Sequence, residues 1–188
     1  SEYLGKILAG DNSMETKQIL EILLRSNFKS LKMKYINEFN CWLMIAIILF
    51  AFSKTQKNSF VYSLEKSMKV GQLIRRCDAI YIHKCILVIF ELKNNVYKKE
   101  SPLEYIDKRE YVEFVIRYFQ KHEPQVIEKI TTVRRIGIEF FGKNKDYKVN
   151  ISIQEDIKMT DFINNQEEEN EFLGRFRKRK INQSSEIN

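Results

Sequence analysis

Three charged side chains lie at the ends of two largely apolar runs, and their types and spacing are suited to phosphate chemistry. Asp78 precedes the run AIYIH, and Glu91 and Lys93 follow the run CILVIF. Residues two apart in a strand share one face, so Glu91 and Lys93 are expected to point the same way. If a hairpin turns through Lys84 and Cys85, its register places Asp78 opposite Glu91, whereas a loop of odd length would shift this pairing.

Two carboxylates that face each other about 5 Å apart repel unless a hard cation joins them. Mg²⁺ accepts one or two carboxylates together with water and substrate phosphate oxygens, and Mn²⁺ suits the same ligands. Asp78 and Glu91 therefore predict a Mg²⁺ (or Mn²⁺) site, beside which Lys93 would add positive charge near a scissile phosphate. Asp, Glu and Lys at a strand end also form ordinary ion-pair clusters, and the pattern alone leaves that alternative open.

The elements that position these residues are read from apolar periodicity. Helices are expected as two short pieces within 2–26, over 35–52 and over 102–122, the last with Ser101 as its cap and Pro124 at its end. Strands are expected over 60–64, 73–82, 85–90, 134–140 and 147–153, with a turn at 142–146. The order predicts an α/β fold: helix, three-strand antiparallel meander, helix and further strands, with extra N-terminal helices.

Composition limits the possible classes of protein. The chain has 188 residues and a formal net charge of +7, which is compatible with a polyanionic partner. Its six glycines form no Gly-rich phosphate loop, and its three cysteines form no CxxC pair. The longest apolar run, 41–52, is too short for a membrane span and predicts a buried helix with Trp42, Phe50 and Phe52 in the core. No secretory signal is found, so we expect an intracellular protein, nuclear or cytoplasmic.

Two regions are expected, because the character of the sequence changes near residue 154. Residues 1–154 would form the domain. Residues 155–188 contain the acidic run EEE and the basic run RFRKRK, and are expected to form a charged, flexible tail.

The order of elements, with D…ExK, resembles the PD-(D/E)XK nuclease superfamily, and in particular the nuclease-like domain at the C-terminus of AAA-ATPase-like proteins. The stretches that carry the resemblance are YLGKILAGD at Tyr3–Asp11, NEF at Asn37–Phe39, R-x-D at Arg76–Asp78, FELK at Phe90–Lys93, Leu103 to Tyr111, and RIGIEF with GK at Arg135–Lys143. They span residues 2–153.

The resemblance implies a role for each matching residue. Asp78 and Glu91 would be metal ligands together with the main-chain carbonyl of Leu92, and Lys93 would be the catalytic lysine. Glu38 would be an auxiliary acid; a carboxylate favoured by the helix dipole is the alternative. The implied activity is metal-dependent hydrolysis of phosphodiester bonds in DNA or RNA.

Basic residues near this site are candidates for phosphate contacts, with ordinary surface solvation as the alternative. They are Arg75, Arg76, Lys98, Lys99, Lys108 and Arg109.

Departures from the family pattern keep a second interpretation open. Arg75 replaces a glycine near Asp78, and Asn40, Cys41 and Trp42 stand where the family has a Tyr-His pair. Tyr105 replaces a glutamine, and the ATPase part has no counterpart in the sequence. The alternatives to a nuclease are therefore a catalytically reduced module that binds nucleic acid or a ribonucleoprotein, and a module that binds a protein partner.

Overall fold

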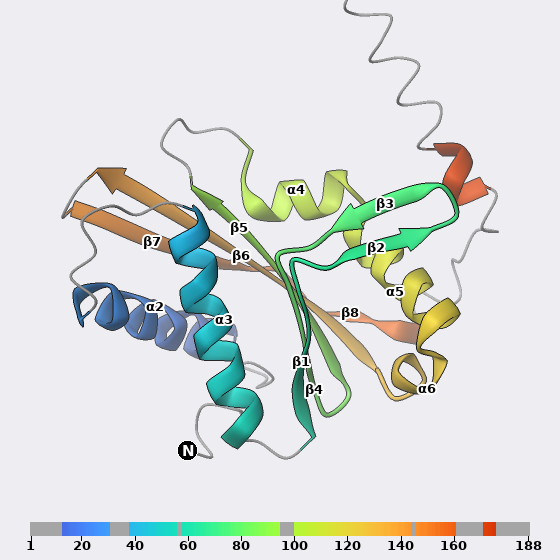
Figure 1. Cartoon of the computed structure of the whole chain (residues 1–188), viewed down its shortest axis with the longest axis horizontal. Helices are drawn as coiled ribbons and strands as arrows, with labels where there is room; N and C mark the ends of the chain where they lie inside the picture. The colour runs from blue at the N-terminus through green and yellow to red at the C-terminus, as the bar shows by residue number, and fades with distance from the viewer. Residues whose placement is uncertain are drawn as a thin grey trace, which may run out of the picture.

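The computed structural model of the protein contains a mixed β-sheet with helices on both of its faces (Figure 1). The structure describes residues 13–30, 38–55, 58–94, 100–143, 146–160 and 171–175. The helices are α2 (Ser13–Ser30), α3 (Glu38–Thr55), α4 (Pro102–Lys108), α5 (Tyr111–His122) and α6 (Pro124–Ile127). The strands are β1 (Ser59–Leu64), β2 (Ser67–Val70), β3 (Leu73–Arg76), β4 (Ala79–His83), β5 (Ile86–Asn94), β6 (Thr132–Lys143), β7 (Asp146–Ile153) and β8 (Ile157–Lys158). The predicted α/β class is confirmed.

The sheet order is β1-β4-β5-β6-β7, with β8 paired to β6. β1, β4 and β5 form an antiparallel meander, β6 is parallel to β5, and β7 is antiparallel to β6. The predicted β4–β5 register is confirmed from the pair His83 and Ile86 to the pair Ala79 and Phe90. The parallel strand follows the α4–α5 crossover, as a parallel connection requires.

Each sheet face has its own apolar core. On one face, α2 and α3 pack against residues such as Tyr81, Phe90 and Leu92. On the other face, α4, α5, α6 and the β2–β3 hairpin pack against residues such as Ile80 and Ile89. β4 and β5 are therefore buried from both sides, which explains their nearly continuous apolar sequences.

Two expected elements are divided in the structure. The strand expected over 73–82 is interrupted between β3 and β4 at Cys77 and Asp78, and β2 was not expected. The helix expected over 102–122 is divided at Glu110, whose φ of 53° lies in the left-handed region. The division lets α4 lie along β5 and β6 while α5 packs against β2. The first of the two N-terminal helices falls in 1–12, outside the described residues.

Part of the segment expected as a tail, 155–188, packs against the domain. β8 pairs with β6, and Met159 is buried. Phe172 is fully buried in the core that contains α5, and the side chain of Leu173 lies against Gly71 in the β2–β3 turn. The packed structure therefore continues beyond residue 154.

Within the described ranges, no helix combines the length and apolar character needed to cross a membrane.

Candidate functional site

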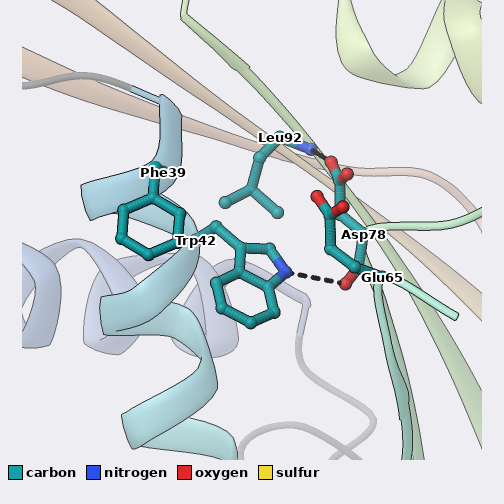
Figure 2. A pocket seen from close by; sticks show the side chains of 5 residues that line it. All are labelled: Phe39, Trp42, Glu65, Asp78 and Leu92. Carbon is teal, nitrogen blue, oxygen red and sulfur yellow. Dashed lines mark hydrogen bonds between the residues drawn. The ribbon is translucent and has the colours of Figure 1, made fainter.

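Asp78 lies in the bend between β3 and β4, where three separate segments bind it. The indole Nε1 of Trp42 on α3 donates a hydrogen bond to the Asp78 carbonyl oxygen at 3.1 Å. The N–H of Glu65, just after β1, donates to the same oxygen at 3.0 Å. The N–H of Leu92 on β5 donates to the carboxylate Oδ2 at 2.6 Å. Both the backbone and the side chain of Asp78 are therefore fixed (Figure 2).

Glu91 and Lys93 share the face of β5 that lies towards α4. The Lys93 Nζ is 2.7 Å from Oε1 of Glu91, whose side chain is only 3% exposed. The same Nζ lies 3.8 Å from the ring centroid of Tyr105 on α4, a cation–π contact. Burial lowers the pKa of Lys93, but the hydrogen bond and charge of Glu91, followed by Tyr105 and Asp78, outweigh it and leave that pKa raised.

The charges of Asp78 and Glu91 both raise the pKa values of Cys77 and Lys93. Their side chains nevertheless turn to different elements, that of Asp78 towards α3 and that of Glu91 towards α4. Strict alternation would have placed the Asp78 side chain on the α5 side with Ile80. The bend instead buries Cys77 in that core, and the Asp78 side chain lines a pocket beside α3. Burial raises the pKa of the Cys77 thiol, as do the charges of Glu91 and Asp78. The Asp78 carboxylate therefore adjoins the pocket beside α3, whereas Glu91 and Lys93 lie on the face towards α4 with Tyr105, so the expected placing of Asp78 and Glu91 on one face is not observed.

The pocket beside α3 has a volume of about 330 Å³. It is lined by Phe39, Trp42, Glu65, Asp78 and Leu92 (Figure 2). The rings of Phe39 and Trp42 are stacked, with centroids 6.1 Å apart and an interplanar angle of 22°. Two aromatic rings and two carboxylates therefore share one open space.

Sequence reasoning missed three of these lining residues. Trp42 was expected in the core, yet it is only partly buried and lines the pocket. Phe39 is 64% exposed, and nothing in the sequence separated it from the apolar helix that follows. Glu65 follows the strand-like run 60–64, and this position was the only sign in the sequence that it could lie at a strand end. In the structure its φ is 52°. Phe50, also expected in the core, is 50% exposed.

The candidate basic residues occupy several surroundings. Arg76 pairs with Glu65 at 3.2 Å, so its guanidinium lies beside a pocket residue. The Arg109 guanidinium lies 5.0 Å from the Tyr105 ring centroid, beside the ring that also contacts Lys93. Burial lowers the pKa of Arg75, and the charge of Arg109 lowers it further, so these two lie near each other. Arg75, which replaces the family's glycine near Asp78, is not among the residues that line the described pocket.

Three of the predicted site residues contribute no side-chain geometry here. Lys98 and Lys99 lie outside the described residues. Glu38 is the first residue of α3, and its side chain also lies outside the described set. Lys108 is described, and its Nζ pairs with Glu100 at 3.0 Å.

Gly137 on β6 allows α4 to approach the site closely. It is the register partner of Glu91. A Cβ at Gly137 would lie 2.9 Å from the Cβ of Pro102 and 3.3 Å from the backbone N of Leu103. Because glycine has no Cβ, the first turn of α4 can pack directly on β6. Tyr105 on α4 then contacts Lys93.

The donor set at this end of the sheet suits a hard divalent cation. Asp78 and Glu91 supply carboxylate oxygens, the ligand type that Mg²⁺ and Mn²⁺ prefer. Within the described ranges, no group of three or more His, Cys, Asp or Glu side chains is arranged to hold a metal ion. A two-carboxylate site completed by water and substrate oxygens is the arrangement common for Mg²⁺.

Comparison of the chain with protein-family models, with curated proteins and with solved structures finds no match.

Proposed function

We propose that the chain is a metal-dependent phosphodiesterase that cuts DNA or RNA, with a core of the PD-(D/E)XK type. The observation that carries the proposal is the 2.6 Å hydrogen bond that the N–H of Leu92, the residue between Glu91 and Lys93, donates to the Asp78 carboxylate. Nζ of Lys93 is 2.7 Å from Glu91, and the charge of Asp78 also acts on it. The order α3, β1-β4-β5 meander, α4–α5 crossover and parallel β6 supports the same fold type.

Asp78 and Glu91, with the main-chain carbonyl of Leu92, would hold Mg²⁺ or Mn²⁺. When bound, such an ion supplies an activated water and neutralises charge that develops on the phosphate. Lys93 is held by Glu91 and by the face of Tyr105, with its side chain 25% exposed. From this position its ammonium group can donate to a phosphate oxygen. Because the group is already held in place, no free energy is spent on ordering it when the phosphate binds, which is what electrostatic preorganisation means.

The fixed backbone of Asp78 has a role in the same chemistry. Its carbonyl accepts from Trp42 and Glu65, so the carboxylate starts from a defined position. Arg76, beside Glu65, and Arg109, beside Tyr105, add positive charge on the two sides of the site. These charges would attract the phosphate backbone of a nucleic acid.

One observation favours a second candidate, a module that binds nucleic acid, a ribonucleoprotein or a protein partner without turnover. Asp78 already accepts from the N–H of Leu92, and Glu91 is already paired with Lys93. Both negative charges are thus compensated inside the protein, as in a purely structural cluster.

Cleavage assays separate the two candidates. The full chain is incubated with end-labelled single- and double-stranded DNA and RNA in Mg²⁺, in Mn²⁺ and in EDTA. We expect metal-dependent cleavage that falls by about 100-fold or more in Glu91→Gln and in Lys93→Ala. Lys129→Ala, which alters an exposed lysine in the turn after α6, is the matched control and should cleave as the unaltered chain does.

Circular dichroism of each variant checks that it is folded. Cleavage that persists in folded Glu91→Gln and Lys93→Ala would contradict the proposal. Salt-dependent binding with no cleavage in either metal would favour the second candidate.

A further inference from the structure

The pocket beside Asp78 contains an aromatic surface that metal-and-lysine chemistry does not require. Phe39 and Trp42 lie one turn apart on α3, and their rings are stacked. Phe39 is 64% exposed, which is unusual for a large aromatic side chain. Trp42 is held by its hydrogen bond to Asp78, so the orientation of its indole is fixed (Figure 2).

The chemistry of this surface fits a flat aromatic ligand that is attached to a phosphate. Nucleobases stack on Trp and Phe side chains, and each such stack contributes substantially to the binding of single strands. Arg76 pairs with Glu65 at the pocket, and its side chain is 60% exposed, so it can meet a phosphate there. A base in a duplex is stacked on both faces by its neighbours and is not available to these rings, whereas an unpaired base is.

We propose that Phe39 and Trp42 stack an unpaired nucleobase of a single-stranded DNA or RNA, next to the phosphate that reaches Asp78. The position of that phosphate rests on the proposed function, but stacking itself requires no cleavage. The substrate class is then single-stranded nucleic acid, including frayed ends of duplexes.

A competing use of Phe39 comes from the apolar stripe along α3. Phe39, Leu43, Ile47 and Phe50 are all exposed, at helical spacing. A protein partner or a second copy of the chain that covered this stripe would use all four residues. Of the four residues in this stripe, the base-stacking proposal uses only Phe39. Phe50 lies eleven residues, or roughly 16 Å, further along the helix and is therefore too far from the pocket to contact the same base.

Trp42 is the only tryptophan in the chain, so its fluorescence reports directly on the pocket. The full chain is mixed rapidly with 12-nucleotide oligo-dT, oligo-rU, an abasic strand of the same length, or a blunt duplex. The buffer contains Ca²⁺, which binds carboxylate oxygens. We expect the Trp42 fluorescence recorded directly after mixing to be quenched by oligo-dT and oligo-rU, which carry bases. The abasic strand and the duplex should not quench it. The dT and rU arms show which sugar is preferred.

Matched variants locate the binding surface. Phe39→Ala should weaken single-strand binding by about fivefold or more, the lower end of the contribution of one base–aromatic stack. Phe50→Ala, which alters the same residue type on the same helix, should bind as the unaltered chain does. Quenching by the abasic strand, or equal losses in both variants, would overturn the proposal. So would association of the chain that depends equally on Phe39 and Phe50 in size-exclusion chromatography.

The two proposals fail in different ways. Base-dependent quenching without cleavage would retain the stacking proposal and reject the phosphodiesterase. Cleavage of single and double strands at equal rates, without base-dependent quenching, would do the reverse.

Discussion

The indole of Trp42 donates its N–H to the carbonyl oxygen of Asp78 at 3.1 Å, which joins α3 to the bend that precedes β4. The two residues are 36 positions apart in the sequence. The same carbonyl accepts from the N–H of Glu65. An acidic residue in an irregular segment is thus held by a helix on one side and by the end of β1 on the other.

Trp42→Phe removes the indole donor and keeps an aromatic ring. Loss of one partly buried hydrogen bond should lower the free energy of unfolding by about 1 kcal/mol. Urea unfolding followed by circular dichroism measures this, because the variant has no tryptophan fluorescence. Phe39→Leu removes no hydrogen-bond donor and should stay within about 0.5 kcal/mol of the unaltered chain. Equal stability of Trp42→Phe and the unaltered chain would show that the hydrogen bond contributes nothing.

His83 provides a pH-dependent contribution to stability at the other end of β4. Its ring is buried and shares a hydrogen bond with the Ser59 hydroxyl. Burial lowers the pKa of His83 from its usual 6.5, and the charge of Lys84 lowers it further. The unfolded chain therefore binds a proton more readily, so stability is fully present above pH 6.5 and falls as the pH drops through the folded pKa.

We expect urea midpoints measured between pH 7.5 and 4.5 to show this loss in the unaltered chain. His83→Gln, which retains a polar partner for Ser59, should show a smaller decline. Ser59→Ala keeps the buried ring and should keep the pH dependence while lowering stability at every pH. If the decline in His83→Gln matches that of the unaltered chain, His83 is not its source.

The β4–β5 hairpin and its register followed from the sequence, because both strands are apolar and meet at the short turn of Lys84 and Cys85. The break at Cys77 and Asp78 did not follow. Residues 73–82 were interpreted as one strand, with no Gly or Pro to mark a break, and packing against α5 and α3 determines which side chain turns to which face. The left-handed Glu110 between α4 and α5 is likewise specified by tertiary packing, with no Gly or Pro to mark it.

The candidate site divides in the same way. That Glu91 and Lys93 share one face could be predicted, because they lie two residues apart on β5. The expected place of Asp78 on that face could not, because the bend before β4 turns its side chain towards α3. The roles of Trp42 and Phe39 could not be predicted, since the apolar run 41–52 predicted a buried helix with Trp42 in the core. In the structure α3 covers one face of the sheet, so its outward residues are exposed.

Gly137→Ala tests whether α4 must lie close to β6. The added Cβ would lie 2.9 Å from the Cβ of Pro102 and near the backbone of Leu103, neither of which is a flexible side-chain end. Such overpacking should cost about 1–3 kcal/mol of unfolding free energy. Gly174→Ala is the matched control, because its Cβ would meet nothing within 4 Å, and its stability should be unchanged. Equal urea midpoints for the two variants would mean that α4 shifts without cost.

Phe172 attaches residues 171–175 to the domain, and its removal should release them. The ring is fully buried, with the guanidinium groups of Arg117 and Arg175 at 4.6 and 5.5 Å from its centroid. Arg175 also pairs with Glu113 at 2.7 Å, so it is held on α5.

Phe172→Ala should lower the unfolding free energy by up to about 3–5 kcal/mol, less if the segment detaches while the sheet stays folded. Detachment would expose the chain at Arg175, so limited trypsin digestion should cut there faster than in the unaltered chain. Phe172→Leu keeps an apolar side chain in the cavity and should lose less stability and remain more resistant to trypsin. Unchanged cutting at Arg175 together with unchanged stability in Phe172→Ala would mean that the ring does not hold this segment.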